Sequence, residues 1–73
     1  MSVYYFSFGQ SHVHRIDGVT LDADVLLRVE DDDQVNARHR VFDAIGPKWH
    51  TQYTEENVDF SYFPRGYVEV PSI

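Results

Sequence analysis

The sequence contains no cysteine. It therefore has no thiolate nucleophile, no cysteine-ligated zinc and no disulfide, which suits a reducing compartment. It also has no apolar run near the roughly 20 residues of a membrane-spanning helix. The opening MSVYYFSFGQ lacks the basic and apolar regions of a signal peptide. From these absences we expect a cytoplasmic protein with no membrane segment.

Basic residues are scarce: six Lys and Arg stand against twelve Asp and Glu, a formal net charge of −6. Proteins that bind the nucleic-acid backbone need a basic footprint that releases counterions. We therefore expect no direct binding to nucleic acid. An acidic surface favours solubility and a partner with a basic surface.

At 73 residues the chain predicts a single domain, residues 1–73, with no room for a second core. A domain this small buries only about 60% of the surface of its unfolded chain. Five Phe, five Tyr and one Trp compensate, because aromatic side chains bury a large area per ordered residue.

Three segments in the first half of the chain have clear patterns. Residues 3–8 (VYYFSF) are largely apolar on both alternating sides, which predicts a central strand covered on both faces. Residues 9–24 are mostly polar and predict a long loop or a ragged hairpin around Asp17 and Gly18. Residues 25–30 alternate and predict a half-buried strand, with Val25, Leu27 and Val29 inward and Arg28 and Glu30 outward.

A helix follows the second strand. Asp31 to Gln34 has the spacing of a capping box, and Gly46 followed by Pro47 is a strong stop signal. After the stop, residues 49–53 alternate as a third strand, and residues 60–73 contain a turn at 64–66 and a short strand or packed tail near residues 67–70. The apolar residues that recur at helical spacing are Val35, Ala37 (or Arg38), Val41, Phe42 and Ile45.

Together these elements predict an α+β, two-layer fold: one helix on a three to four stranded, mainly antiparallel sheet, β-β-α-β plus a C-terminal strand or tail. The first strand should lie between the second and third and run antiparallel to both. One helix covers only one face of such a sheet. The other face needs either a homodimer or the aromatic tail, which holds Phe60, Tyr62, Phe63 and Tyr67.

Several short motifs are spread along most of the chain. They are F-G-Q-x-H at residues 8–12, A-R at 37–38, G-x-K-W at 46–49, Q-Y-x-E-E at 52–56 and Y-F-P-x-G at 62–66. In these motifs the chain resembles a group of short proteins of tailed bacteriophages and prophages that has no assigned activity. The resemblance implies a small phage-encoded accessory protein that acts on a host molecule in the host cytoplasm.

The segment FGQSHVH, residues 8–14, is the best candidate for a ligand site. If the chain stays extended past Gly9, His12 and His14 point to the same side and can share a divalent metal, which would still need further ligands. An anion or nucleotide is the other candidate ligand. The residues that would hold it are Gly9, Gln10, His12, His14, Arg15 and Arg65.

Two functions remain open. We expect no catalysis, because Ser7 or Ser11 beside the histidines has no elbow motif and no orienting acid. The favoured function is binding of a host protein with a basic surface; the alternative is binding of a small ligand or metal at residues 8–14, with no other cofactor expected. The acidic face predicted to bind the partner consists of Glu30, Asp31, Asp32, Asp33, Glu55, Glu56 and Asp59.

Overall fold

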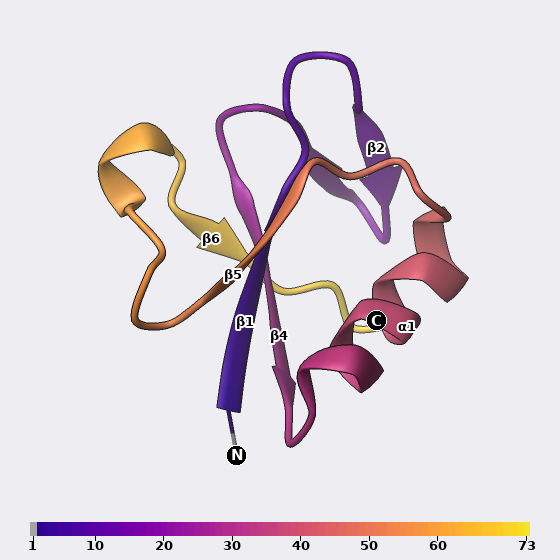
Figure 1. Cartoon of the computed structure of the whole chain (residues 1–73). Helices are drawn as coiled ribbons and strands as arrows, with labels where there is room; N and C mark the ends of the chain where they lie inside the picture. The colour runs from indigo at the N-terminus through magenta and orange to yellow at the C-terminus, as the bar shows by residue number, and fades with distance from the viewer. Residues whose placement is uncertain (1) are drawn as a thin grey trace.

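The central strand of the fold is β1 (Ser2–Ser7), seen in a computed structural model that describes residues 2–73 (Figure 1). It lies in a four-stranded sheet of order β5-β1-β4-β6. A two-stranded hairpin, the helix α1 and a short 3-10 helix η1 complete the fold. The remaining elements are β2 (His14–Ile16), β3 (Val19–Leu21), β4 (Leu26–Asp31), α1 (Gln34–Ile45), β5 (Thr51–Thr54), η1 (Phe60–Tyr62) and β6 (Tyr67–Val68).

The strand order follows the prediction. β1 pairs antiparallel with β4, with Tyr5 opposite Arg28, and antiparallel with β5 on its other side, with Tyr5 opposite Tyr53. β6 adds a fourth strand, which runs parallel to β4 and places Tyr67 opposite Leu26. The predicted α+β arrangement of one helix on a mainly antiparallel sheet is confirmed, and the C-terminal segment is both a strand and a tail.

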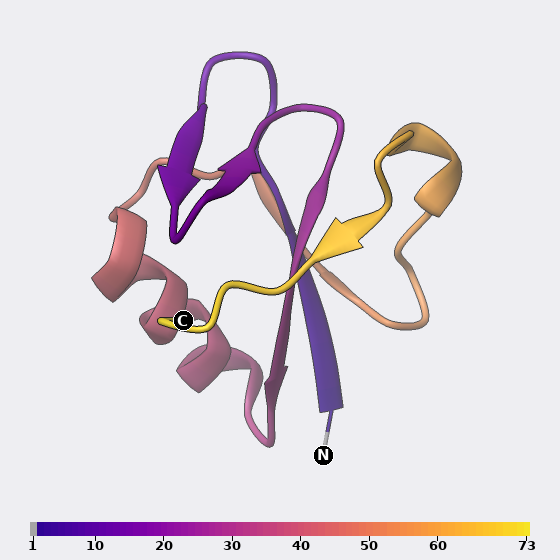
Figure 2. The ribbon, with the colours of Figure 1, turned by 180° about the vertical axis from the view of Figure 1, so that it is seen from behind.

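The β2–β3 hairpin is the ragged hairpin predicted around Asp17 and Gly18. Both turn residues have positive φ, 53° and 78°, as a tight two-residue hairpin requires. Leu21 at the end of β3 is fully buried. The hairpin therefore covers one end of the core as well as connecting β1 to β4 (Figure 2).

The helix cap lies two residues later than the capping-box spacing predicted. The N-cap is Asp33, whose Oδ1 accepts the backbone N–H of Val35 at 2.8 Å. The Asp31 carboxylate instead accepts the N–H of Asp33 at 3.0 Å, so the prediction of a box from Asp31 to Gln34 was wrong. The C-terminal stop is confirmed: Gly46 has φ 67° and donates its N–H to the Phe42 carbonyl at 2.7 Å.

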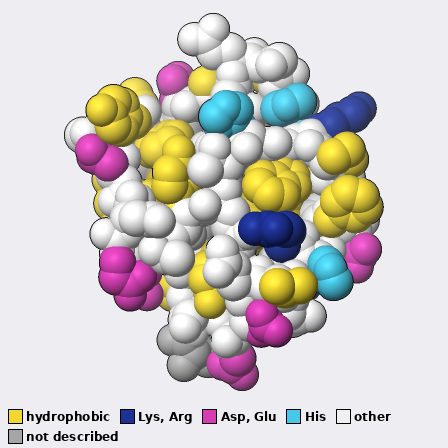
Figure 3. Space-filling model, viewed as in Figure 1, with side chains coloured by type: hydrophobic (Ala, Val, Ile, Leu, Met, Phe, Trp, Pro, Cys, Tyr) yellow, Lys and Arg dark blue, Asp and Glu magenta, His cyan; other side chains and the backbone are white. Residues whose placement is uncertain are grey.

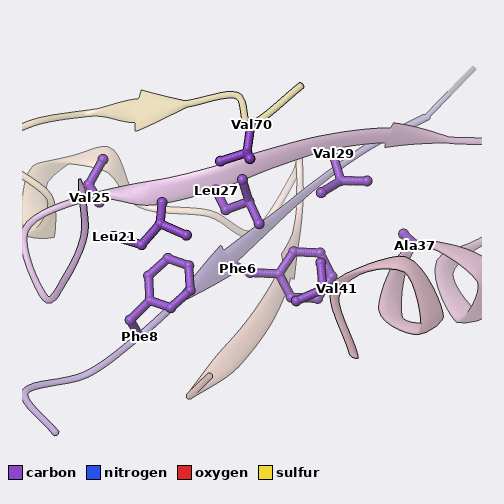
Figure 4. Close-up of a cluster of buried hydrophobic side chains, with 9 residues drawn as sticks. All are labelled: Phe6, Phe8, Leu21, Val25, Leu27, Val29, Ala37, Val41 and Val70. Atoms are coloured by element: carbon purple, nitrogen blue, oxygen red, sulfur yellow. The ribbon is translucent and has the colours of Figure 1, made fainter. Parts of the chain in front are cut away.

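The buried stripe of α1 is narrower than its apolar pattern. Ala37 and Val41 are fully buried against the sheet, but Val35 is 54% and Phe42 53% exposed. The apolar pattern at helical spacing therefore extends beyond the part of the helix that is buried. The core between sheet, helix and hairpin is shown in Figure 4; its residues are Phe6, Phe8, Leu21, Val25, Leu27, Val29, Ala37, Val41 and Val70.

The second face of the sheet is covered by the aromatic tail. The Phe60 ring meets Tyr5 edge-on at 5.2 Å, and the Tyr67 ring stacks on Tyr5 at 5.8 Å. Leu26 is also fully buried, so β4 is not half-buried at its start as predicted. The tail thus supplies the cover that we expected either from it or from a homodimer.

Candidate functional site

The chain does not stay extended past β1. Gly9 has φ 64°, a left-handed conformation that lets the strand turn, and residues 9–11 form a turn. The geometric condition for His12 and His14 to share one side of a strand is therefore not met. His14 starts β2 instead, and His12 precedes it in irregular chain.

The His14 imidazole is already engaged inside the fold. Its Nε2 lies 2.7 Å from the Lys48 carbonyl oxygen, and its ring packs edge-on against Phe8 with centroids 5.9 Å apart. A neutral imidazole whose nitrogen donates to a carbonyl loses that nitrogen as a metal ligand. The contact ties β2 to the segment that leaves the helix.

A third histidine, which the sequence pattern did not single out, lies next to this loop. His50 precedes β5 and packs over Gly9: a Cβ placed on Gly9 would be 3.5 Å from His50 Cδ2. Its Nδ1 is 2.6 Å from the hydroxyl oxygen of its neighbour Thr51. Within residues 2–73, no group of three or more His, Asp or Glu side chains is arranged to hold a metal ion.

Both arginines proposed for an anion site lie beside Thr20, because Arg15 is its partner across the β2–β3 hairpin and Arg65 donates to its carbonyl. Arg65 pairs with Asp22 at 3.0 Å and donates to the Thr20 carbonyl at 3.1 Å, which fastens the 64–66 turn to the chain before β4. Arg15 is exposed on β2, and Gln10 is exposed in the turn after Gly9. Of the proposed set, the fold therefore brings Arg15 and Arg65 to the same residue of the hairpin, whereas Gly9 and Gln10 lie in the turn after β1.

The acidic residues are brought together by the topology. Because β4 and β5 both run antiparallel to β1, both end beside its start: Ser2 pairs with Asp31, and Tyr4 pairs with Thr54. Residues 30–33, at the end of β4, and residues 55–56, directly after β5, therefore lie toward the end of the sheet at which β1 begins. In Figure 1 the turn after β4 lies beside the N-terminus, and the turn after β5 lies on the other side of β1. We call this the acidic end; it consists of Glu30, Asp31, Asp32, Asp33, Glu55 and Glu56.

The carboxylates of the acidic end differ in how far they are neutralised. Glu30 pairs with Arg28 at 2.6 Å and Asp31 with Arg40 at 3.3 Å. Hydrogen bonds from the backbone of Asp33 and from the Asn36 and Arg40 side chains lower the pKa of Asp31, against a smaller opposing effect of desolvation. The other four are exposed and form no ion pair with any residue from 2 to 73. Asp33 caps the helix, and the remaining three are Asp32, Glu55 and Glu56.

The surface of the acidic end is hollowed between β1 and the turn after β5. A depression of about 240 Å³ is lined by backbone and side chains of both segments, and Glu55 and Glu56 form part of its rim. Lining residues on β1 are Ser2, Val3 and Tyr4. Two of the carboxylates without an ion pair among residues 2–73, those of Glu55 and Glu56, therefore lie beside a concave surface.

Asp59, the last member of the predicted acidic face, belongs to a different part of the molecule. Its carboxylate caps η1, accepting the N–H of Ser61 at 2.9 Å and its hydroxyl at 2.6 Å. These hydrogen bonds lower the pKa of Asp59. It thus lies beside the aromatic tail, with Phe60 next in sequence.

No protein-family model matches this chain, and no curated protein or solved structure is similar enough to match it. Its single α-helix has 12 residues, and none of the described chain forms a helix long and apolar enough to cross a bilayer. The function must therefore be argued from the geometry of the chain itself.

Proposed function

We propose that the protein is a non-catalytic binding protein that recognises a basic surface on another protein through the acidic end. The observation that supports this proposal is the convergence of residues 30–33 and 55–56, which are distant in sequence, at one end of the sheet. In keeping with the tailed-phage resemblance, we propose that the partner is a host protein in the host cytoplasm.

The physical basis of the proposed binding is long-range electrostatic attraction between the acidic end and a basic partner. Like charges gathered at one end of a small domain create a potential that steers an oppositely charged partner and raises the association rate. Contacts within the fold account for only part of the negative charge of the acidic end: Asp33 caps the helix, and Glu30 and Asp31 form ion pairs. Asp32, Glu55 and Glu56 remain available to meet Lys and Arg of a partner.

The test compares two variants of equal net charge for their binding to the same partner protein. The variant Glu55→Gln with Glu56→Gln removes two charges at the acidic end. Its control, Asp24→Asn with Asp43→Asn, removes two exposed charges elsewhere, so the net charge of both proteins is equal. The partner is recovered from host lysate on the wild-type protein, identified by mass spectrometry and purified, and association rates are measured from low to high salt.

The expected result is an association rate at low salt that falls about three- to tenfold in the acidic-end variant and stays near the wild-type value in the control. The difference should shrink as salt rises, because screening weakens surface charges. Equal losses in the two variants, or a complex indifferent to salt, would contradict the acidic end as the recognition surface.

The second candidate is a small anion, nucleotide or metal ligand at residues 8–14. The observation in its favour is the packing of His50 over Gly9, which brings an imidazole from β5 to the loop that carries His12. Native mass spectrometry of purified protein with zinc, phosphate or ATP tests it. A bound species that disappears in His12→Ala with His50→Ala supports this candidate, and unliganded protein under all three conditions rejects it.

A further inference from the structure

A second exposed surface lies on the face of the sheet opposite the helix. We call it the aromatic face; it consists of Phe60, Tyr62 and Tyr67. Phe60 is 47%, Tyr62 76% and Tyr67 48% exposed, although all three are large aromatic residues. In Figure 3 hydrophobic side chains gather over the η1 region at the upper left, with acidic side chains beside them. Clustered exposed apolar side chains are a feature of interaction sites, and aromatic residues are enriched in protein interfaces.

Two of the three rings are held in place by the sheet. Phe60 and Tyr67 both pack on Tyr5, at 5.2 and 5.8 Å, and they meet each other edge-on at 6.2 Å. The cap from Asp59 fixes the start of η1, which carries Phe60 and Tyr62. A partner that binds here would therefore order little of this surface, which lowers the entropic cost of binding.

The charge around the aromatic face shows which partner it fits. Arg28 lies with its guanidinium carbon 5.8 Å from the Tyr67 ring centroid, and its guanidinium pairs with both Glu30 and Glu69. The surface thus already holds one arginine between an aromatic ring and carboxylates. Glu69 is largely exposed although it pairs with Arg28, and Asp59 directly precedes Phe60 although it caps η1. Both carboxylates therefore contribute negative charge beside the rings while already holding partners within the fold.

The same charges argue against a second copy of the chain as the occupant. Each copy carries a formal net charge of −6, and bringing two acidic rims together costs free energy through like-charge repulsion. A basic occupant instead gains attraction at the rim. Arginine suits the site better than lysine, because its planar guanidinium both stacks on aromatic rings and pairs with carboxylates.

We propose that the aromatic face binds an arginine-containing peptide segment of the partner, with an apolar side chain on Phe60 and Tyr62 and a guanidinium against Glu69. This inference rests on the proposed function: the acidic end supplies attraction, and the aromatic face supplies the anchoring contacts. Buried aromatic and arginine contacts carry most of the affinity in typical interfaces.

A displayed peptide library tests this inference. Wild-type protein is used to select binders from a random dodecapeptide library on yeast, and the enriched peptides are synthesised and titrated by fluorescence anisotropy. The variant Tyr62→Ala removes an exposed ring from the aromatic face. The control Phe42→Ala removes another exposed ring, 53% exposed against 76% for Tyr62, from α1 on the other layer of the fold.

The expected result is enrichment of peptides that combine arginine with apolar residues. Their affinity should fall at least about tenfold for Tyr62→Ala and less than about twofold for Phe42→Ala. Enriched peptides without arginine, or peptides whose affinity Tyr62→Ala leaves intact, would overturn the inference. So would binding of oligo-dT at this face, or a wild-type homodimer that Tyr62→Ala dissociates in size-exclusion chromatography.

The same titrations separate this inference from the proposed function. If Glu55→Gln with Glu56→Gln slows association of the captured partner while Tyr62→Ala has no effect on it or on the peptides, the proposed function stands and the aromatic face is rejected. If only Tyr62→Ala weakens binding, the aromatic face stands and the acidic end is rejected.

Discussion

The aromatic tail gives a quantitative prediction about stability, because two of its rings have very different surroundings. Phe60 is about half buried and packs edge-on against Tyr5. Tyr62, two residues later, is 76% exposed and is in none of the ring pairs of the described chain. Replacing each residue with alanine therefore distinguishes a ring that covers the sheet from a ring that is only exposed on the surface.

The cost of Phe60→Ala can be worked from the burial. A half-buried phenyl ring removes on the order of 80 Å² from water, worth about 2 kcal/mol at about 25 cal/mol per Å². The edge-on contact with Tyr5 adds about 0.5–1 kcal/mol, since aromatic pairs contribute beyond their area. We expect Phe60→Ala to lower the free energy of unfolding by about 2–3 kcal/mol, and Tyr62→Ala by less than about 0.5 kcal/mol.

Urea unfolding followed by tryptophan fluorescence measures both variants. The single tryptophan, Trp49, packs edge-on against Phe6 at 5.2 Å in the core, so its emission reports global unfolding. The two variants should differ in midpoint with similar slopes. Equal midpoints for Phe60→Ala and Tyr62→Ala would refute the argument that the tail covers the second face of the sheet.

Three further predictions concern local features and use the same unfolding assay. Gly9→Ala should cost about 1–2 kcal/mol because φ 64° strains any L side chain, whereas Ser11→Ala in the same exposed turn should be neutral; equal costs would contradict this. Asp33→Ala should cost about 1 kcal/mol through loss of the helix cap, with Asp32→Ala as a near-neutral control, and a neutral Asp33→Ala would reject the observed cap. Because hydrogen bonds lower the pKa of Asp31 in the folded state, the stability that it supplies is full at neutral pH and lost as the pH falls below about 4; Asp31→Asn should flatten this decline, and an unchanged curve would contradict it.

Much of the fold could be predicted because its signals are local. Apolar residues on both sides of residues 3–8 indicated the central strand, Asp17 and Gly18 the hairpin turn, and Gly46 the end of the helix. Each signal depends on one or two residues whose backbone or burial preference is strong. The sheet order then followed from the pairing of successive elements.

The exposed side of the helix could not be predicted, because periodicity identifies an apolar stripe but not the width of the surface that covers it. Val35 and Phe42 continue the pattern of Ala37 and Val41, yet they lie outside the buried stripe. Val70 from the tail and Leu21 from the hairpin fill part of the core in their place. Such contacts come from distant parts of the chain and leave no mark in the local pattern.

For the candidate sites too, the local sequence was informative only in part, because the fold decides which residues meet. The histidines at residues 12 and 14 drew attention because they are close in sequence, but Gly9 redirects the chain between them and β1. The acidic end joins segments more than 20 residues apart, which only the parallel course of β4 and β5 brings together. Spacing along the chain indicates a site only while the backbone stays regular.

Arg28 links the two proposed recognition surfaces into one. It pairs with Glu30 of the acidic end and with Glu69 beside the aromatic face, and it lies over Tyr67. The hydrogen bond that Arg28 donates to Glu30 is the largest cause of the raised pKa of Arg28. A partner arginine that reaches Glu69 must share this carboxylate with Arg28, whereas Asp32, Glu55 and Glu56 have no such competitor among residues 2–73. We therefore expect the acidic end to attract a basic partner most strongly and the aromatic face to provide the more specific contacts. Together the two surfaces would orient the partner on the protein.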